Sequence, residues 1–484
     1  MNSVVRTLTG FRDWVDARFP LMQLWNDHLA RYYAPKNFNF WYYFGSLAML
    51  VLVIQIVTGI WLTMNYKPGA DLAFASVEYI MRDVEWGWWI RYMHSTGGSA
   101  FFVVVYLHMY RALLYGSYKQ PRELLWVIGM FIYLTLMGEA FFGYLLPWGQ
   151  MSYWGAQVII SLFGALPWIG DDLALLIRGD FVVSDVTLNR FFSFHVIALP
   201  LLLCGLVGAH LLALHEVGSN NPDGVEIKKH KDANGVPLDG IAFHPYYTVK
   251  DLVGAVVFLI IFCAVVFFSP EMGGYFLEHA NFVPADPLKT PEHIAPVWYF
   301  TPYYAILRAI PNQLGGVIAM GSATFMFFLL PWLDRSPVKS IRYRGWRYRV
   351  ALALFTLSFL ILGVMGVQPV TPEFTWLSRF CAIVYFLYFF FLLSITTPDD
   401  SRGFVRYYKL CLRGLVWALT VGFTYSWIKG LPANELDKTP LMDKLDSPST
   451  YFVIALLLLA ALIETFKFYR QDVDAIPPER VRWS

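Results

Sequence analysis

Ten long apolar segments constrain this chain more than any other feature of its sequence. They lie at about residues 40–64, 88–115, 124–146, 190–214, 250–269, 313–332, 348–366, 379–397, 408–428 and 451–467. A bilayer core of about 30 Å needs about 20 apolar residues in a helix, and backbone polar groups there must be satisfied within the segment. The chain is 57% hydrophobic and only 15% charged. The sequence therefore predicts an all-α, polytopic membrane protein with ten crossings.

Two of these segments carry histidines at matched intervals. His94 and His108 are fourteen residues apart in one segment, and His195 and His210 are fifteen apart in another. In a helix these steps correspond to about 21 and 22 Å along the axis, and a fourteen-residue step leaves both side chains close to one face. Ionisable groups inside a membrane span usually mark a working site. If the two helices pack side by side, His94 can face His195 and His108 can face His210.

Two stacked pairs of imidazoles suit two haems, because imidazole is an axial ligand of haem iron. Ordinary packing histidines and a Zn or Cu site are the alternatives, but the two pairs are too far apart along each helix to share one metal ion. The chain has four cysteines and no CxxCH sequence, so any haem is expected to be non-covalent, as a b-type haem is. No disulfide framework is expected, and no basic cluster indicates binding to nucleic acid.

Glycines repeat the histidine interval in two neighbouring segments. Gly45 and Gly59 are fourteen residues apart, as are Gly129 and Gly143. Glycine lets a backbone approach a large flat group closely, although a single glycine would equally fit ordinary helix packing. The repeated interval favours clearance for a cofactor in each histidine layer.

Basic residues predict the orientation of the chain. The connection after the sixth segment, residues 334–349, contains six basic residues and one acid, and the short connection near Lys119 and Arg122 is also basic. The positive-inside rule places both in the cytoplasm. The connections 65–87, 147–189 and 270–312 then lie on the outer side, and both chain ends are predicted to be cytoplasmic. Residues 1–36 have no signal-peptide core and are expected to form an amphipathic helix on the membrane surface.

Several longer motifs, in their order along the chain, closely resemble cytochrome b, the core subunit of quinol–cytochrome c reductase (the cytochrome bc1 complex). They are RYMHSTGGS, GYLLPWGQMSYWGAQVI, HEVGSNNPDG, FHPYYTVKDLVG and PVWYFTPYYAILRAIPNQLGG. The resemblance covers about residues 15 to 400. It implies an eight-helix core with a four-helix di-haem bundle, and the two further C-terminal spans are additional to it.

The resemblance assigns cofactor-binding roles residue by residue. His94 and His195 would hold the lower-potential haem near the outer face, with Gly59 and Gly143 against the ring. His108 and His210 would hold the higher-potential haem near the inner face, with Gly45 and Gly129. The residues that would neutralise haem propionates are Arg91 and Arg111, which fits the bidentate pairing of guanidinium with carboxylate.

The resemblance also implies two quinone pockets. The outer, quinol-oxidising pocket would be built from Tyr144, Gly155, Ala156 and Tyr299. The inner, quinone-reducing pocket would be built from Ser46, His215, Lys250 and Asp251. A histidine beside a carboxylate can supply the two protons that quinone reduction consumes at physiological pH.

The function implied is quinol oxidation at the outer pocket, electron transfer through two b haems, and quinone reduction at the inner pocket, with proton translocation (the Q cycle). The implied partners are a Rieske-type iron–sulfur protein, a membrane-anchored c-type cytochrome, ubiquinol and ubiquinone, and a second copy of the chain in a homodimer. The PVWY sequence and the lack of a targeting segment favour the inner membrane of a bacterium. A di-haem anchor of a dehydrogenase or hydrogenase, the chloroplast relative and a transporter are the rival interpretations.

Three departures from the family pattern stand out. Val297 replaces the glutamate of the usual PEWY sequence, which removes a carboxylate that could accept a quinol proton, and Glu292 is a candidate substitute. The fifteen-residue step from His195 to His210 exceeds the mitochondrial step by one residue, which requires a local distortion, for which Pro200 is the candidate position. The chain also continues well beyond the usual eighth helix.

Four parts follow from these patterns along the chain. Residues 1–36 form the surface helix, 37–216 the di-haem bundle, 217–400 the quinone-site helices with the PVWY loop, and 401–484 an extension with two spans.

Overall fold

The structure, a computed structural model, describes residues 3–396 and 474–483. Within these residues eight helical segments are long and apolar enough to cross a membrane. Their helices are α3 (Tyr43–Thr63), α5 (Gly87–Tyr115), α6 (Glu123–Leu145), α10 (Leu199–Val217), α11 (Phe243–Phe268), α13 (Gln313–Leu333), α14 (Trp346–Val367) and α15 (Pro372–Thr396). The prediction of an all-α, polytopic membrane protein is confirmed. The ninth and tenth predicted spans, 408–428 and 451–467, lie outside the described residues.

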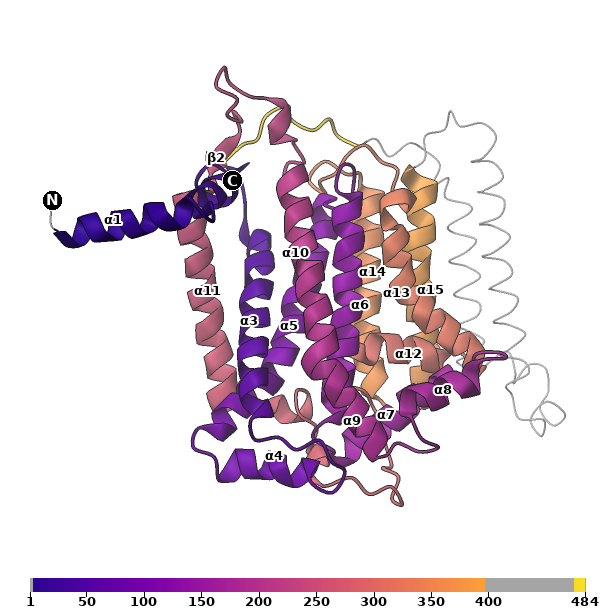
Figure 1. Cartoon of the computed structure of the whole chain (residues 1–484). Coiled ribbons are helices and arrows are strands. Elements are labelled where there is room, and N and C mark those ends of the chain that lie inside the picture. Colours follow the sequence, from indigo (N-terminus) through magenta and orange to yellow (C-terminus); the bar gives the residue numbers. More distant parts are fainter. Residues whose placement is uncertain (1–2, 397–473, 484) are drawn as a thin grey trace, which may run out of the picture.

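The long helices run roughly parallel and form one bundle (Figure 1). Helix α3 packs closely on α5, and α6 packs closely on α10. Helices α13, α14 and α15 lie on the opposite side from α11 in this view. A large cluster of buried apolar side chains joins α5 and α6 to α13–α15, so the histidine-bearing helices are packed against the rest of the bundle.

The connections predicted to lie on the outer side fold into short helices that the apolar pattern of the sequence did not predict. These are α4 (Ala73–Arg82), α7 (Gln150–Phe163), α8 (Gly170–Arg178), α9 (Asp185–Ser193) and α12 (Thr301–Ala309), with 3-10 turns at Met272–Gly274, His279–Phe282 and Trp298–Phe300. They lie at the end of the bundle opposite the described chain ends (Figure 1). Local helix formation satisfies the backbone hydrogen bonds of connections that lie against the bundle.

The opposite end of the bundle, which is predicted to be the inner one, contains the shorter N-terminal elements. They are α1 (Ser3–Asp16), α2 (Leu21–Trp25), a π-helical turn (Asn26–Ala30), a 3-10 turn (Phe40–Tyr42) and the strand β1 (Tyr33–Pro35), while another 3-10 turn lies at Ile227–Lys229. Strand β1 pairs antiparallel with β2 (Gly240–Ala242), so that Tyr33 faces Ala242. Helix α1 projects sideways from the bundle (Figure 1). This direction, across the bundle axis, suits a helix that lies along the membrane surface.

A π-helical turn at Phe194–Ala198 joins α9 to α10 and contains His195. Pro200 lies in the first turn of α10. Because a π turn holds one more residue than an α turn, it takes up the extra residue between His195 and His210. The local distortion that the fifteen-residue step requires is therefore present, and it begins ahead of Pro200. Proline has no N–H and its ring crowds the carbonyl four residues earlier, which favours the wider turn.

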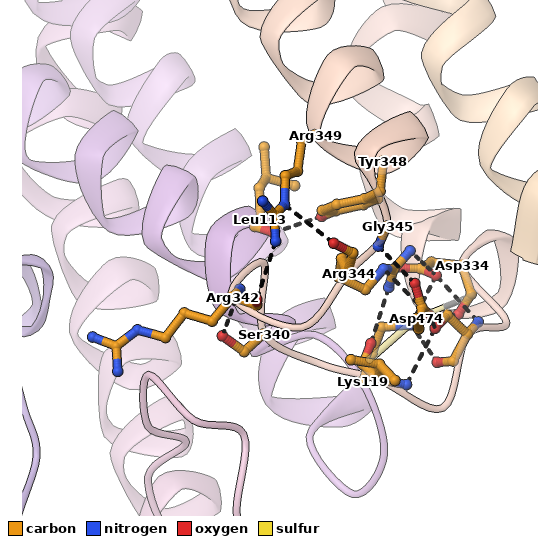
Figure 2. A network of polar contacts seen from close by, with 12 residues as sticks. Leu113, Lys119, Asp334, Ser340, Arg342, Arg344, Gly345, Tyr348, Arg349 and Asp474 are labelled. Carbon is orange, nitrogen blue, oxygen red and sulfur yellow. Dashed lines mark hydrogen bonds and ion pairs between the residues drawn. The ribbon is translucent and has the colours of Figure 1, made fainter. Parts of the chain in front are cut away.

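A buried ionic cluster ties the connections at the inner end together (Figure 2). The carboxylate of Asp334 accepts from Arg344 at 3.0 and 3.1 Å and pairs with Lys119 at 2.8 Å. It also accepts from the Tyr118 hydroxyl at 2.5 Å. Burial alone would raise the pKa of Asp334, but the two cations outweigh burial and lower it to about 2. Asp334 is thus a fixed anion that neutralises two buried cations.

The described C-terminal segment, residues 474–483, packs against the same inner surface. The carboxylate of Asp474 accepts from the Ser336 hydroxyl at 2.5 Å and from the Gly345 amide at 2.9 Å. Arg480 pairs with Asp239 at 3.1 Å. This segment and the last turn of α15 lie at the same end of the bundle (Figure 1).

Replacing Asp334 by Asn is expected to lower the free energy of unfolding by about 3–5 kcal/mol, because Lys119 and Arg344 would be left buried without an anion. Because the pKa of Asp334 is lowered from 3.8 to about 2, its contribution is present above pH 3.8 and is lost as the pH falls through about 2. Thermal unfolding of the detergent-solubilised protein measures the change. Asp83→Asn, at an exposed acid on the outer side, is the matched control; equal melting temperatures for the two variants would contradict the assignment.

Candidate functional site: paired histidines between two polar clusters

The four predicted histidines form two pairs. In each pair one histidine lies on α5, and its partner lies in the π turn (His195) or on α10 (His210). The ring centres of His94 and His195 are 6.1 Å apart, and those of His108 and His210 are 6.5 Å apart. The four side chains are all partly buried. Each pair thus brings two imidazoles from different helical segments close together within the bundle, with the two rings edge-on to one another.

Each imidazole lies beside one of the four spaced glycines. A Cβ at Gly45 would be 3.2 Å from Cε1 of His108, and a Cβ at Gly59 would be 3.1 Å from Cε1 of His94. The same holds for α6, where a Cβ at Gly129 would be 3.2 Å from the His210 ring and a Cβ at Gly143 would overlap the His195 ring. Helices α3 and α6 therefore carry glycine at the places where the histidine rings need space.

The outer histidine pair has its Nδ1 atoms engaged, which leaves Nε2 for another partner. Nδ1 of His94 lies 2.9 Å from the Thr58 hydroxyl oxygen, and this hydroxyl donates to the Ile54 carbonyl. Nδ1 of His195 lies 2.9 Å from the backbone carbonyl and 3.0 Å from the carboxylate of Glu139. A hydrogen bond at Nδ1 fixes the ring orientation and makes Nε2 a better metal ligand.

These pairs fit an iron-bearing macrocycle. A metal–imidazole bond is about 2 Å long, so ring centres 6.1 and 6.5 Å apart leave room for one metal ion between the two rings of each pair. No group of three or more His, Cys, Asp or Glu side chains within residues 3–396 and 474–483 is arranged to hold a metal ion. Two nitrogen ligands per site suit a metal whose other ligands come from a ring, which is the case for haem iron.

The two predicted arginines lie on the same helix as the first histidine of each pair. Arg91 and Arg111 each lie three residues from a histidine of α5. The guanidinium of Arg111 stacks over the Tyr42 ring at 5.0 Å, and its Nε is buried with no hydrogen-bond partner among the described residues. A buried guanidinium with an unused donor is suited to a carboxylate, such as the propionate of a haem.

A cluster of outer-side residues forms around Tyr144 at the end of α6. The Tyr144 hydroxyl donates to the Glu278 carboxylate and accepts from the Asn281 amide at 2.9 Å. A Cβ at Gly155 would be 3.8 Å from the Tyr144 ring, and the neighbouring Ala156 is buried in α7. The structure thus brings together three of the residues predicted for the outer pocket.

Tyr299, in the PVWY sequence, lies near this cluster and is held by α5. Its ring stacks on Phe102 with centres 3.8 Å apart, and its backbone carbonyl accepts from the Tyr106 hydroxyl at 2.6 Å. Burial and, after it, the carboxylate of Glu278 raise the pKa of Tyr299. Tyr299 therefore faces the same outer region as Tyr144 and Glu278.

The structure does not bring Glu292 to Tyr144. Glu292 is exposed, and none of the hydrogen bonds between described residues joins it to Tyr144. The acid in contact with Tyr144 is Glu278, which was not among the predicted site residues. Glu278 is one of four acids in residues 270–300, and no sequence motif distinguishes it from the other three.

The inner cluster is built from the ends of three long helices. Ser46 on α3 and Asp251 on α11 lie within hydrogen-bonding reach of one another. The Lys250 ammonium donates to the Phe38 carbonyl at 2.9 Å. In the last turn of α10, the ring of His215 stacks on Tyr32 with centres 4.7 Å apart. The predicted inner residues thus lie toward the inner ends of α3, α10 and α11, and Ser46 lies within reach of Asp251.

These features define the class of the protein. It is a polytopic membrane protein whose helix bundle places two histidine pairs between polar clusters at its outer and inner ends, as a transmembrane electron carrier requires.

Comparison with known proteins identifies the family. Residues 29–218 match the family described as Cytochrome b/b6/petB, and residues 284–386 match the family described as Cytochrome b(C-terminal)/b6/petD. The chain is 62% identical over 397 residues to cytochrome b of Allochromatium vinosum, an alignment that covers 80% of this chain and 96% of the relative. The chain therefore belongs to the cytochrome b family, whose members are electron-transfer proteins that bind haem b.

Two further comparisons agree with this assignment. Cytochrome b of Rhodospirillum rubrum is 50% identical over 376 residues, covering 78% of this chain and 90% of the relative. A chain of a solved hyperthermophilic respiratory complex III superimposes with a TM-score of 0.74 at 39% identity, covering 79% of this chain and 98% of that chain.

Gly143→Ala is expected to lower the haem bound per protein chain, because the added Cβ would overlap the His195 ring and displace it. Absorbance of the purified protein in the haem α-band measures the loss. Gly98→Ala is the matched control, because a Cβ at Gly98 would meet no atom within 4 Å. Equal haem content in the two variants would show that the space beside His195 is not needed for the cofactor.

Proposed function

We propose that this chain is the electron-carrying subunit of a quinol–cytochrome c reductase of the complex III type. It would oxidise quinol at the outer cluster, carry electrons across the membrane through two b haems, and reduce quinone at the inner cluster. The observation that carries the proposal is the pairing of four histidines with four glycines in two layers. Protons would be released outside and taken up inside, as in a Q cycle.

In this proposal His94 and His195 hold the outer haem, and His108 and His210 hold the inner one. When bound, each haem iron accepts and passes on one electron at a time. Thr58 and the Glu139 carbonyl orient the outer pair through the Nδ1 atoms. Arg91 and Arg111 neutralise the propionates, and the glycines of α3 and α6 leave space for the rings. The lower-potential haem is assigned to the outer pair and the higher-potential haem to the inner pair.

The residues of the two polar clusters bind quinone and exchange protons in this proposal. Tyr144, Gly155, Ala156 and Tyr299 form the outer pocket. At the inner pocket Ser46 and Asp251 lie together, and Lys250 and His215 complete the set. A carboxylate and an imidazole at one site can supply the two protons that a reduced quinone needs.

The family and the match to a complex III chain support a set of partners. We assign a Rieske-type iron–sulfur protein and a membrane-anchored c-type cytochrome as electron acceptors on the outer side, ubiquinol and ubiquinone as substrates, and a second copy of the chain in a homodimer. The bacterial relatives support the inner membrane as the location, and the basic connections support an orientation with both chain ends in the cytoplasm.

A redox titration of the purified protein tests the proposal directly. We expect two non-covalent b haems per chain, titrating at separate potentials, because the two histidine layers lie in different surroundings. The α-band absorbance measures both. A single haem, or none, would remove the proposed electron path.

His215→Ala is expected to slow reoxidation of the inner haem by added quinone by at least about tenfold, since it removes a proton donor. Rapid-mixing spectroscopy after pre-reduction of the haems measures this rate. His230→Ala, at an exposed histidine on the same inner side, serves as the control. Unchanged reoxidation kinetics in His215→Ala would reject the assignment of this residue.

A further inference from the structure

The position that carries a carboxylate in the PEWY form of this family is apolar here. Val297 is 5% exposed and belongs to the main apolar cluster of the bundle. A quinol bound beside Tyr144 and Tyr299 therefore has no acceptor for its proton at this position. Four acids lie in the same outer connection, namely Glu271, Glu278, Asp286 and Glu292.

Glu278 is the acid that reaches the outer cluster. Its carboxylate accepts a hydrogen bond from the Tyr144 hydroxyl, and the Asn281 side-chain amide donates a hydrogen bond to the same hydroxyl. The electrostatic interaction with Tyr299 places Glu278 near both tyrosines of the cluster. Its side chain is partly buried, so it keeps contact with the outer solvent while facing the cluster.

Hydrogen bonds hold the segment that carries Glu278 against the start of α7. The Gln150 amide donates to the Val283 carbonyl at 3.0 Å, and the Ala285 amide donates to the Trp148 carbonyl at 3.0 Å. The side-chain oxygen of Asn281 accepts from the Ser152 amide at 2.7 Å. The Trp154 indole donates to the Asp286 carbonyl at 3.2 Å. Because α7 also presents Gly155 to Tyr144, one rigid unit positions the carboxylate and the pocket wall together.

The chemistry of the Glu278 carboxyl suits proton exchange. Burial raises its pKa from 4.5 to about 7, and the hydrogen bond from Tyr144 only partly offsets this. The groups that face it are Tyr144 from α6, Tyr299 from the PVWY turn and Asn281 from its own segment. A base whose pKa lies near the working pH can both accept a proton and release it.

We propose that Glu278 is the proton acceptor for quinol oxidation at the outer site, in place of the carboxylate that Val297 removes. The assignment rests on the proposed function. A quinol loses two electrons and two protons: one electron goes to the iron–sulfur protein and one to the outer haem. Glu278 takes the proton of the hydroxyl nearest Tyr144, the O–H bond breaks, and the proton then leaves to outer solvent. The second proton leaves from the other hydroxyl on the side of the iron–sulfur protein.

The test uses the purified complex with its iron–sulfur and c-type cytochrome partners and compares the wild type with Glu278→Gln. The glutamine carbonyl can still accept a hydrogen bond from the Tyr144 hydroxyl, so this contact is kept while the proton-accepting carboxylate is lost. Rapid mixing with a ubiquinol analogue, with the inner site blocked, gives the rate of haem b reduction. We expect the rate to fall on the order of 10²-fold. We also expect the rise of the wild-type rate with pH, centred at about 7, to disappear.

Further variants separate a base from a structural support. Glu278→Asp keeps a carboxylate and is expected to retain the pH dependence at a reduced rate. Val297→Glu in the Glu278→Gln background is expected to restore both rate and pH dependence. Glu85→Gln, at an exposed acid on the outer side, is expected to match the wild type. Infrared difference spectra on quinol oxidation should show a protonated carboxyl band that is missing in Glu278→Gln.

The outcomes distinguish the two levels of the proposal. If the wild type shows quinol-driven haem reduction and Glu278→Gln has the same rate and pH profile, Glu278 is not the acceptor and the proposed function still stands. Loss of the pH dependence in Glu292→Gln instead would overturn the assignment in favour of Glu292. If the wild-type complex shows no quinol-driven haem reduction, the proposed function itself fails.

Discussion

The absence of water from the bilayer core is the constraint on which the rest of this structure depends. Each membrane segment must satisfy its own backbone hydrogen bonds, so the described spans are helices and polar side chains inside them are few. A helix bundle packed this tightly has no natural space for a flat cofactor. The four glycines of α3 and α6 supply that space, since each lies where any Cβ would press against a histidine ring. The histidine and glycine intervals are therefore two parts of one requirement: a ligand on one helix and a gap on its neighbour, repeated in two layers.

The extra residue between His195 and His210 shows how local backbone geometry can preserve that arrangement. In a regular helix this residue would rotate one histidine by about 100° relative to the other. The π turn at Phe194–Ala198 absorbs it, and the two histidines still face His94 and His108. The sequence interval revealed that a distortion was needed. Its location within the turn that contains His195, ahead of Pro200, depends on backbone hydrogen bonding that residue spacing alone does not determine.

The eight described spans agree closely with the apolar segments because hydrophobic length is a strong and local signal. Helices α4, α7, α8 and α9 were missed because they lie in connections of mixed composition, where packing against the bundle decides the conformation. Glu278 was missed for a related reason. Four acids share its connection, and only the fastening of this segment to α7 brings one of them to Tyr144. Residues on long helices could be placed by counting, whereas residues in a folded connection could not.

The ionisable groups at the two ends of the bundle illustrate how surroundings assign different roles to the same kind of side chain. Asp334 at the inner end is buried between Lys119 and Arg344, which lower its pKa to about 2, so it stays charged at every physiological pH. Glu278 at the outer end has no cation among its hydrogen-bond partners within the described residues, and burial raises its pKa to about 7. A carboxylate that stays charged, such as Asp334, serves to hold the connections of the bundle together. One that changes its charge near neutrality, beside two tyrosines and partly open to solvent, is suited to move protons. Both carboxyl groups lie in connections at the ends of the bundle, so their depth in the membrane does not explain why their pKa values differ. The pKa values differ because Asp334 has two cations beside it.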